Sequence, residues 1–237
     1  MYKLEMHCHS QEVSVCSKCS ATELIARYKA AGYAGIVSTN HINRGTYQKM
    51  EDRPWKEKAY HFIQGYEALK NAAADQDFDV LLGCEINLTP VPQLSKDLIN
   101  QGWNEYIPND YLVYGITEEW LYNVGDVRYM TMEELSQSVH EAGFLLVHAH
   151  PFRCGTIVMN PDLYDGYEVF NGNPRQQSHN ELADAWAEMN HKMKTSGTDF
   201  HWPEDPPCGG IITEKRIRDN EMLLRILRNG DYALLLG

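Results

Sequence analysis

The chain opens with two histidines separated by one residue, His7 and His9, within the segment Leu4–Ser10. Side chains alternate between the two faces of a β-strand, so a strand here would place both imidazoles on one face and Met6 and Cys8 on the other. Imidazole nitrogens grouped at the end of a strand are typical ligands of a transition-metal ion. The first residues therefore indicate metal chemistry.

Four further segments carry imidazole or carboxylate groups at, or just beyond, the end of an apolar or small-residue run. They contain His41, then Glu85, then His148 with His150, and finally Asp199 with His201. A buried carboxylate without a partner is costly, so metal ligation accounts for Glu85 and Asp199 better than chance placement does. Imidazoles and carboxylates that converge at strand ends form multinuclear metal centres, and the chain is first predicted to be a metallohydrolase.

Composition limits the classes to which the chain can belong. Its 237 residues suit one large domain, 43% of them are hydrophobic, and the formal net charge of −12 argues against binding a long nucleic-acid backbone. We expect a cytoplasmic protein, because no apolar run is long enough to span a membrane and no signal region precedes His7. The six cysteines are expected to be reduced, and Cys16 and Cys19 lack the second pair that a four-cysteine zinc site requires.

Strand-like and helix-like segments alternate along the chain. We expect strands near 4–10, 35–39, 80–85, 111–116, 144–147, 167–171 and 232–236, and helices near 24–31, 54–69, 131–143, 178–193 and 219–228. Capping boxes at Ser20–Glu23 and Thr131–Glu134 support two of the helix starts. The alternation predicts one α/β domain over residues 1–237, with parallel strands and right-handed crossovers. In a parallel barrel the site lies at the carboxyl ends of the strands, where these histidines fall.

The ordered elements resemble the PHP family, named for polymerase and histidinol phosphatase domains. They are His7-x-His9, His41, Glu85, His150-Pro151 and Gly197-Thr198-Asp199-x-His201. The resemblance covers nearly the whole chain and implies a distorted (β/α)7-type barrel that holds two or three divalent metal ions. It implies one metal among His7, His9, Glu85 and Asp199, a second that shares Glu85 and takes His150, and a third held by His41 and His201. Zinc, manganese and iron all suit these donors.

The chain departs from the family pattern at two positions. The loop residue that completes the third site is usually Asp or His and is here Cys16, either a thiolate ligand or an unliganded cysteine beside the site. The family's strand-four histidine is absent from 111–114, so the second metal is expected to lack a ligand unless His148 replaces it. His148 and His150 share a face if the fifth strand stays extended.

The resemblance also implies a phosphorylated substrate. Arg153 follows His150 closely, and its guanidinium is expected to bind phosphate, with Asn171 and Arg175 as further candidates for substrate binding. We expect hydrolysis of a phosphoester, a monoester rather than a diester, by a water that bridges two metals and loses a proton before it attacks phosphorus. The metals and Arg153 would stabilise the charge on the phosphoryl oxygens, and Asp199 or His201 would protonate the leaving oxygen.

Two other functions fit parts of this pattern. Amidohydrolases, which cleave C–N bonds, also begin with His-x-His on a barrel, but they commonly use a lysine or glutamate near strand four, and 111–116 contains no lysine. A noncatalytic metal-binding or interaction module is the other alternative, since PHP domains accompany polymerases. We expect a small phosphorylated substrate, no membrane partner and no extended nucleic-acid binding, and the oligomeric state stays open.

Overall fold

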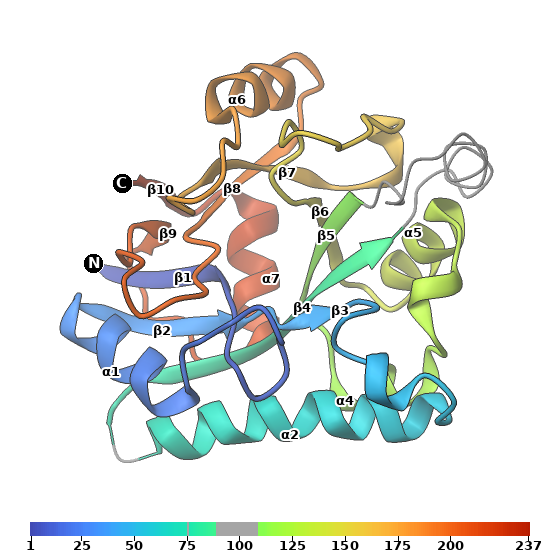
Figure 1. Ribbon diagram of the computed structural model, residues 1–237. Helices are drawn as coiled ribbons and strands as arrows, with labels where there is room; N and C mark the ends of the chain where they lie inside the picture. Colours follow the sequence, from blue (N-terminus) through green and yellow to red (C-terminus); the bar gives the residue numbers. More distant parts are fainter. Residues whose placement is uncertain (75, 89–108) are drawn as a thin grey trace.

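The computed structural model describes residues 1–74, 76–88 and 109–237 (Figure 1). Its strands form one sheet in the order β10-β9-β1-β2-β4-β5-β6-β7-β8, with β3 paired to β4. A parallel bridge between Cys8 and Phe200 joins the carboxyl ends of β1 and β8 and brings the sheet close to a closed barrel. The chain is therefore a mixed α/β protein with a barrel-like sheet, as the sequence predicts.

The strands and helices have the following bounds. The strands are β1 (Tyr2–Cys8), β2 (Tyr33–Ser38), β3 (His41–Ile42), β4 (Asp79–Leu88), β5 (Asn109–Tyr114), β6 (Leu145–His148), β7 (Gly166–Asn171), β8 (Met193–Gly197), β9 (Gly209–Thr213) and β10 (Ala233–Leu236). The α-helices are α1 (Ala21–Ala30), α2 (Trp55–Ala73), α4 (Glu118–Asn123), α5 (Met132–Glu141), α6 (Asn180–Met189) and α7 (Asn220–Asn229).

Strand directions differ from the all-parallel arrangement that the sequence led us to expect. β1, β2 and β4 are parallel neighbours, and so are β6, β7 and β8. β5, however, is antiparallel to both β4 and β6. Because β5 is reversed, its first residues lie at the edge of the sheet where its neighbours have their carboxyl ends. This reversal decides which residue of β5 reaches the site.

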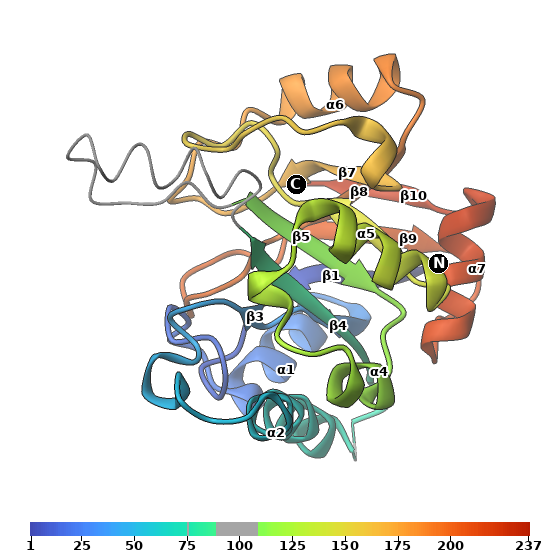
Figure 2. The same cartoon turned by 90° about the vertical axis from the view of Figure 1, so that its right-hand side faces the viewer.

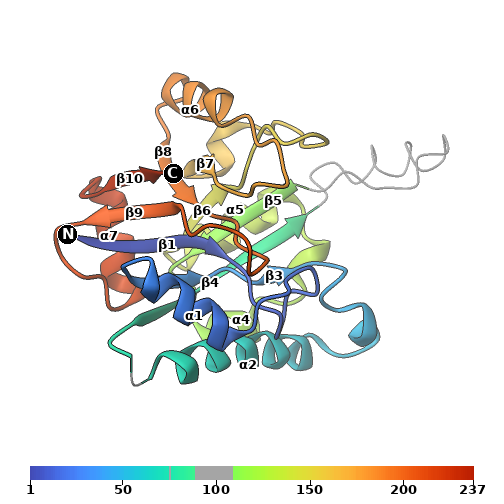
Figure 3. The ribbon, with the colours of Figure 1, turned by 60° about the vertical axis from the view of Figure 1, so that its left-hand side comes forward.

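The described residues also contain more strands than seven β/α repeats would supply. β9 was not predicted, because Pro206, Pro207 and the Gly209-Gly210 pair are residues typical of a turn. In the structure β9 is antiparallel to β1 and to β10. Figure 3 shows these three strands as neighbours, with both chain termini on their side of the molecule. The sheet therefore ends in an antiparallel edge next to β1.

Helix starts follow the predicted capping boxes. The Ser20 hydroxyl accepts from the backbone N–H of Glu23 at 3.3 Å, and the Glu23 carboxylate accepts from the Ser20 N–H at 3.1 Å. Thr131 and Glu134 make the same reciprocal pair before α5. Each bond satisfies an N–H that a helix start leaves free, so these two predictions are confirmed.

Helix α6 is shorter than the predicted segment 178–193. It ends at Met189, and His191 then adopts a left-handed backbone with φ of 52°. From Met193 the chain instead pairs with Gly166 as the first residue of β8. Strand pairing has therefore displaced the last helical turn that the sequence suggested.

The helices pack on the outside of the curved sheet. α1 packs against β2 and α2, α2 against β4, α5 against β6 and α6 against β7 (Figures 1 and 2). α7 contributes Leu223, Ile226 and Leu227 to an apolar cluster that also contains Leu4 of β1 and Tyr114 of β5. Since β1 and β5 are not neighbours in the sheet, this cluster fills the space that the sheet encloses. None of the described helices is long and apolar enough to cross a membrane.

Candidate metal centre

The candidate site lies where the ends of six strands meet. The strands and the residues that follow them deliver His7 and His9 (β1), His41 (β3), Glu85 (β4), Asp110 (β5), His150 (after β6), and Asp199 and His201 (after β8). Strand register explains part of this convergence, because His41 pairs directly with Glu85 across β3 and β4. All of these side chains except Asp199 fall into three groups in which the possible ligand atoms lie within 4.8 Å of one another.

The first group surrounds one oxygen of Glu85 and one of Asp199. The Nε2 atom of His7 lies 3.3 Å from Glu85 Oε2 and 3.5 Å from Asp199 Oδ1. The Nε2 atom of His9 lies 3.3 Å and 3.4 Å from the same two oxygens. All four side chains are at most 2% exposed. Four buried donor atoms therefore face one another, as the sequence led us to expect.

Several atoms of the cluster have no hydrogen-bond partner among the described residues. These are His7 Nε2, His9 Nε2, His41 Nδ1 and Glu85 Oε2. An unsatisfied buried polar group costs about 1–3 kcal/mol, so four of them side by side require a ligand. A divalent cation satisfies imidazole nitrogens and carboxylate oxygens together. The residues present thus fit a metal centre.

Glu85 joins a second group through its other oxygen. Its Oε1 lies 3.2 Å from His150 Nε2, and Asp110 Oδ2 lies 3.7 Å from the same nitrogen. The sequence analysis missed Asp110, because it sought a strand-four ligand among 111–114. Because β5 is reversed, Asp110, the residue before 111–114, reaches the site. The signal available in the sequence was a carboxylate immediately next to an apolar run.

The third group contains His9, His41 and His201, with Cys16 beside it. The ring of His9 lies 4.2 Å, centroid to centroid, from the rings of His41 and His201. Partial burial raises the pKa of the Cys16 thiol, but hydrogen bonds with His201 and His41 outweigh that effect and lower the pKa to about 6. A lowered pKa favours the thiolate, which is the form of cysteine that binds metals.

Charges within the cluster perturb the pKa values of its acids and bases. Burial raises the pKa of the Glu85 and Asp199 carboxyls, but His7 and the other histidines of the cluster together outweigh burial and hold both pKa values well below their usual range. Burial lowers the pKa of His201, and Asp199 more than reverses this, raising it to about 9. Burial, together with the charge of Glu85, raises the pKa of Asp110. Glu85 and Asp199 are thus anionic at neutral pH and ready to bind cations.

Glu168 of β7 lies beneath the cluster and was also missed. Its Oε1 accepts from His7 Nδ1 at 2.7 Å, while its Oε2 accepts from the His150 N–H at 2.9 Å and from the Asn171 amide at 3.0 Å. Since Nδ1 of His7 faces Glu168, Nε2 is the nitrogen that faces the site. A glutamate in the middle of a strand of mainly apolar and aromatic residues was the sequence signal, and in the structure it is 1% exposed.

Two of the candidate ligands have a left-handed backbone. The φ angles of His150 and Asp199 are 29° and 53°. Residues other than glycine rarely adopt this conformation, which costs of the order of 1–3 kcal/mol and is concentrated at functional sites. Glu168 holds the first of these turns by accepting from the His150 N–H. The backbone strain thus falls on two residues that aim side chains into the cluster.

His148 does not reach the cluster. Its ring lies 5.0 Å, centroid to centroid, from Tyr111 and 5.5 Å from Tyr164, and neither nitrogen has a hydrogen-bond partner among the described residues. The expectation that His148 and His150 share a face assumed an extended strand. β6 ends at His148, and the left-handed turn at His150 breaks the alternation of side chains. Asp110 therefore occupies the place for which His148 was considered.

Two arginines line the same cavity as the candidate ligands, a space of about 400 Å³. Arg153 Nη2 donates to Asp199 Oδ2 at 2.8 Å and to Asn171 Oδ1 at 3.0 Å. Arg175 is bound to both oxygens of Asp205, and its guanidinium stacks 4.5 Å from the centre of the Trp202 ring. The side-chain amide of Asn171 thus accepts from Arg153 and donates to Glu168. Both arginines line the cavity.

The PHP domain profile matches residues 5–194 of the chain. Among curated proteins, none is significantly similar in sequence. The fold resembles a two-domain protein from Bacteroides vulgatus described as containing a predicted PHP-like metal-dependent phosphoesterase, with a TM-score of 0.67 and 14% identity over 100% of this chain. This chain spans 65% of the length of that protein.

Two other solved structures have a similar fold. PsfC from Pseudomonas syringae has a TM-score of 0.66 and 15% identity, covering 100% of this chain and 91% of its own. An amidohydrolase from Chromobacterium violaceum, with bound sulfate and no metal, has a TM-score of 0.53 and 16% identity, covering 98% of this chain and 97% of its own. At such low identities these similarities concern the fold.

Proposed function

The chain belongs to the PHP domain family. We propose that it is a metal-dependent phosphomonoesterase acting on a small phosphorylated substrate, and that residues 1–237 form one catalytic domain. The observation that carries the proposal is one cavity with two kinds of wall. The cavity is lined by buried imidazole and carboxylate groups, among which His41 Nδ1 and Glu85 Oε2 have no hydrogen-bond partner among the described residues, and by two guanidinium groups. Metal ions and arginines are the groups that bind and polarise phosphoryl oxygens.

The proposed metal ligands extend the three groups, with Asp199 added to the first and Cys16, which lines the same cavity, to the third. His7, His9, Glu85 and Asp199 form the first set, Glu85 with Asp110 and His150 the second, and His41, His201 and Cys16 the third. Bound divalent ions would supply Lewis acidity and lower the pKa of a coordinated water. Glu85 has one oxygen in each of the first two sets, which supports the bridging role expected of it.

Arg153 is the proposed phosphate-binding residue. Its Nη2 is held by Asp199 and Asn171, and its Nε is buried without a hydrogen-bond partner among the described residues. A guanidinium fixed on one side presents its remaining donors in a rigid plane, which matches two oxygens of a phosphate. Arg175, fixed by Asp205, is the second candidate for contact with the substrate.

The two candidate proton donors differ in charge state. The Asp199 carboxyl, whose pKa is well below its usual range despite burial because His7 is near, has no proton to give at neutral pH. Burial lowers the pKa of His201, but Asp199 raises it to about 9, so this ring carries a proton whenever it is not bound to a metal. We therefore assign metal binding to Asp199, and His201 is the candidate donor of a proton to the leaving oxygen in the state in which it is not bound to the third metal.

Cavity size and charge support a small substrate. A space of about 400 Å³ is at the lower end of the usual range for small-molecule sites. The net charge of −12 disfavours binding a long polyanion around the site. A phosphomonoester of modest size meets both conditions.

The test is a set of matched chromogenic substrates offered to the metal-reconstituted protein. A phosphomonoester, the corresponding diester and the corresponding amide differ mainly in the bond that is cleaved. We expect the monoester to be hydrolysed fastest and chelator-treated protein to be inactive. Faster cleavage of the amide would instead support the function named for the structurally similar amidohydrolase, and absence of any turnover at full metal content would support a noncatalytic module.

A further inference from the structure

The barrel-like sheet closes between β1 and β8, and this β1–β8 seam divides the candidate centre. β1 and the residue after it supply His7 and His9, whereas the segment after β8 supplies Asp199 and His201. Among the described strands, β8 forms a ladder with β7 alone, and a single isolated bridge beyond its end connects it to β1. One bridge is a weak constraint on how the two histidines face the aspartate, so other contacts across the seam have to supply it.

The carboxylate of Glu5 crosses the seam. Glu5 lies in β1, two residues before His7, and its side chain is fully buried. Its Oε1 accepts from the backbone N–H groups of His7 and Thr198, both at 2.8 Å, and from that of Met6 at 3.0 Å. Its Oε2 accepts from the Thr198 hydroxyl at 2.5 Å. One side chain thus binds His7 on one strand and the residue before Asp199 on the other.

The hydroxyl of Thr198 has only one direction in which to donate. Its oxygen already accepts from the backbone N–H groups of Cys208 at 3.1 Å and Gly209 at 2.9 Å. A hydroxyl has two acceptor lone pairs and one hydrogen, so that hydrogen goes to Glu5. Both side-chain oxygens of Glu5 are consequently needed as acceptors, and an amide of the same size offers only one.

The two backbones are in close contact at the seam. Gly197 is the last residue of β8, and a Cβ atom there would overlap His7 Cβ and lie 2.8 Å from Glu168 Oε1. Any side chain at this position would therefore push the end of β8 away from β1. The glycine lets the Thr198 N–H approach Glu5 directly.

Glu5 is not itself a candidate ligand. It belongs to none of the three groups of possible ligands, and it is not among the described residues that line the cavity. Its partner Thr198 is followed by Asp199, whose left-handed backbone aims Oδ1 at the His7 and His9 rings, 3.5 Å and 3.4 Å from their Nε2 atoms. Glu5 therefore acts on the centre through the backbone that carries these side chains.

We propose that Glu5 is a positioning residue of the candidate centre. By binding the His7 N–H together with the N–H and hydroxyl of Thr198, it sets the separation between the two imidazoles of β1 and the carboxylate of Asp199. The inference rests on the proposed function, because it takes these side chains as the first set of metal ligands. It concerns the geometry of that set, however, and its test needs no phosphatase activity.

The experiment uses the full chain loaded with cobalt(II), whose visible absorption reports the geometry of its ligands. Glu5→Gln keeps the size of the side chain but leaves at least one donor at the seam unpaired, so the Thr198 turn should move away from β1. We expect the folded variant to bind cobalt about tenfold more weakly or worse, with an altered visible spectrum at saturation. Circular dichroism measures the folded fraction, so that spectra are compared per folded molecule.

Variants at two further positions separate positioning from stability. Thr198→Val removes the hydroxyl and should alter the spectrum in the same direction, whereas Thr198→Ser retains the hydroxyl and should keep the wild-type spectrum. Ser196→Ala is the matched control. The Ser196 hydroxyl also lies beside the seam, where it accepts from the Gly210 N–H at 3.1 Å and donates to the Leu235 oxygen at 2.5 Å, but neither partner belongs to β1. Its loss should lower the free energy of unfolding and leave the spectrum and the affinity for cobalt unchanged.

The possible outcomes are distinct. Wild-type spectrum and affinity in folded Glu5→Gln and Thr198→Val, or an equal change in Ser196→Ala, would overturn the positioning role and leave Glu5 a contribution to stability alone. If Glu5→Gln does not fold, the two Thr198 variants decide by the same criterion. A wild-type chain that binds no cobalt would overturn the metal centre and this inference together. If cobalt binds and the variants behave as expected but no phosphoester is cleaved, the proposed function fails and this inference stands.

Discussion

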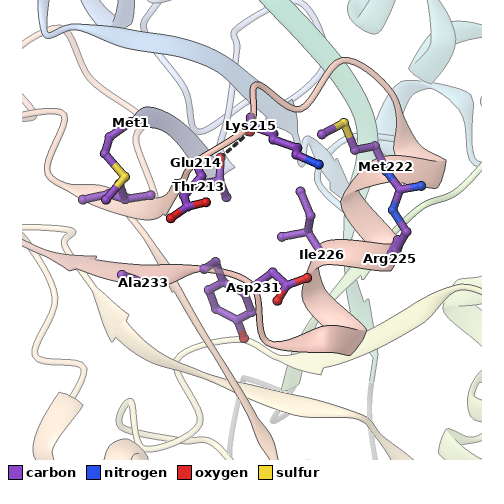
Figure 4. A pocket seen from close by; sticks show the side chains of 11 residues that line it. Met1, Thr213, Glu214, Lys215, Met222, Arg225, Ile226, Asp231 and Ala233 are labelled. Atoms are coloured by element: carbon purple, nitrogen blue, oxygen red, sulfur yellow. Dashed lines mark hydrogen bonds between the residues drawn. The ribbon is translucent and has the colours of Figure 1, made fainter.

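Two cavities at opposite ends of β1 differ in size and in chemistry. The cavity at the candidate centre measures about 400 Å³, and a larger one of about 680 Å³ lies where Met1, the end of β9, the start of β10 and α7 meet (Figure 4). Met1 and His7 are six residues apart, or about 20 Å along a strand at about 3.3 Å per residue. Judged by volume alone, the larger cavity would be taken as the functional site. We call it the α7 cavity.

The side chains that line the two cavities favour the smaller cavity as the functional site. Figure 4 shows the α7 cavity lined by apolar side chains such as Ile226 together with charged groups of both signs, including Lys215 and Asp231. None of its described lining residues has a buried polar atom without a hydrogen-bond partner, whereas His41, Glu85, His150 and Arg153 at the other cavity all do. Buried donors and acceptors without hydrogen-bond partners, and not empty space, thus distinguish the candidate centre from the α7 cavity.

The largest expected effect is at Glu85, where two groups of the candidate centre meet. Glu85→Gln keeps the size of the side chain but removes the charge that two cations would share, so both metal and activity should be lost. Elemental analysis and kinetics on a phosphomonoester measure the two losses. Circular dichroism checks that the variant is folded, and a folded variant with full metal content and near-normal turnover would contradict the bridging role.

A smaller but still large effect is expected from Glu168, which touches ligands and not the cavity. Glu168→Gln no longer offers His7 Nδ1 a charged acceptor, so the ring loses its fixed orientation and its basicity falls. We expect metal affinity to fall about 10- to 100-fold. Titration with a metal-sensitive dye measures this affinity, and restoration of activity at high metal concentration would separate loss of affinity from misfolding. Unchanged affinity would show that His7 needs no such partner.

A third effect is expected at Arg153. Arg153→Lys keeps the charge but loses the planar donor pair, so recognition of the phosphoryl group should weaken while metal content stays the same. The expected loss in kcat/KM is about 10- to 100-fold, from about 1–3 kcal/mol for a charge-assisted hydrogen bond. A kinetically silent substitution would remove Arg153 from the phosphate site.

The same comparison indicates what the sequence could predict. The convergence of His7 and His9 in the candidate cluster could be predicted, because both lie at the end of β1 and the period of a strand is local. Asp110 was missed because its position depends on the direction of β5, which is set by pairing with β4 and β6 and not by the residues of β5 itself. The pattern of residues within one strand contains no information about its pairing with strands that are distant in the sequence.

Backbone geometry accounts for the other differences. His148 was considered on the assumption of extended backbone, and a single left-handed residue, His150, redirected the chain. Glu168 was overlooked among the apolar residues of β7, although a buried carboxylate there carries the same signal that identified Glu85. Sequence patterns thus predict which strands end at the site, while turns and strand direction decide which side chains enter it.

The smallest effect is expected at the α7 cavity. Arg225 lines this cavity from α7 and is exposed, so Arg225→Lys is the matched counterpart of Arg153→Lys. Because Arg225 lies at the opposite end of β1 from the metal ligands, the substitution should leave metal content unchanged and kcat/KM within about twofold. Exposed positions of this kind usually change the free energy of unfolding by no more than about 0.5 kcal/mol. Kinetics and chemical denaturation of both variants in parallel make the measurement. A loss of turnover in Arg225→Lys as large as that in Arg153→Lys would mean that the α7 cavity contributes to the reaction, and the contrast between the two cavities would have to be abandoned.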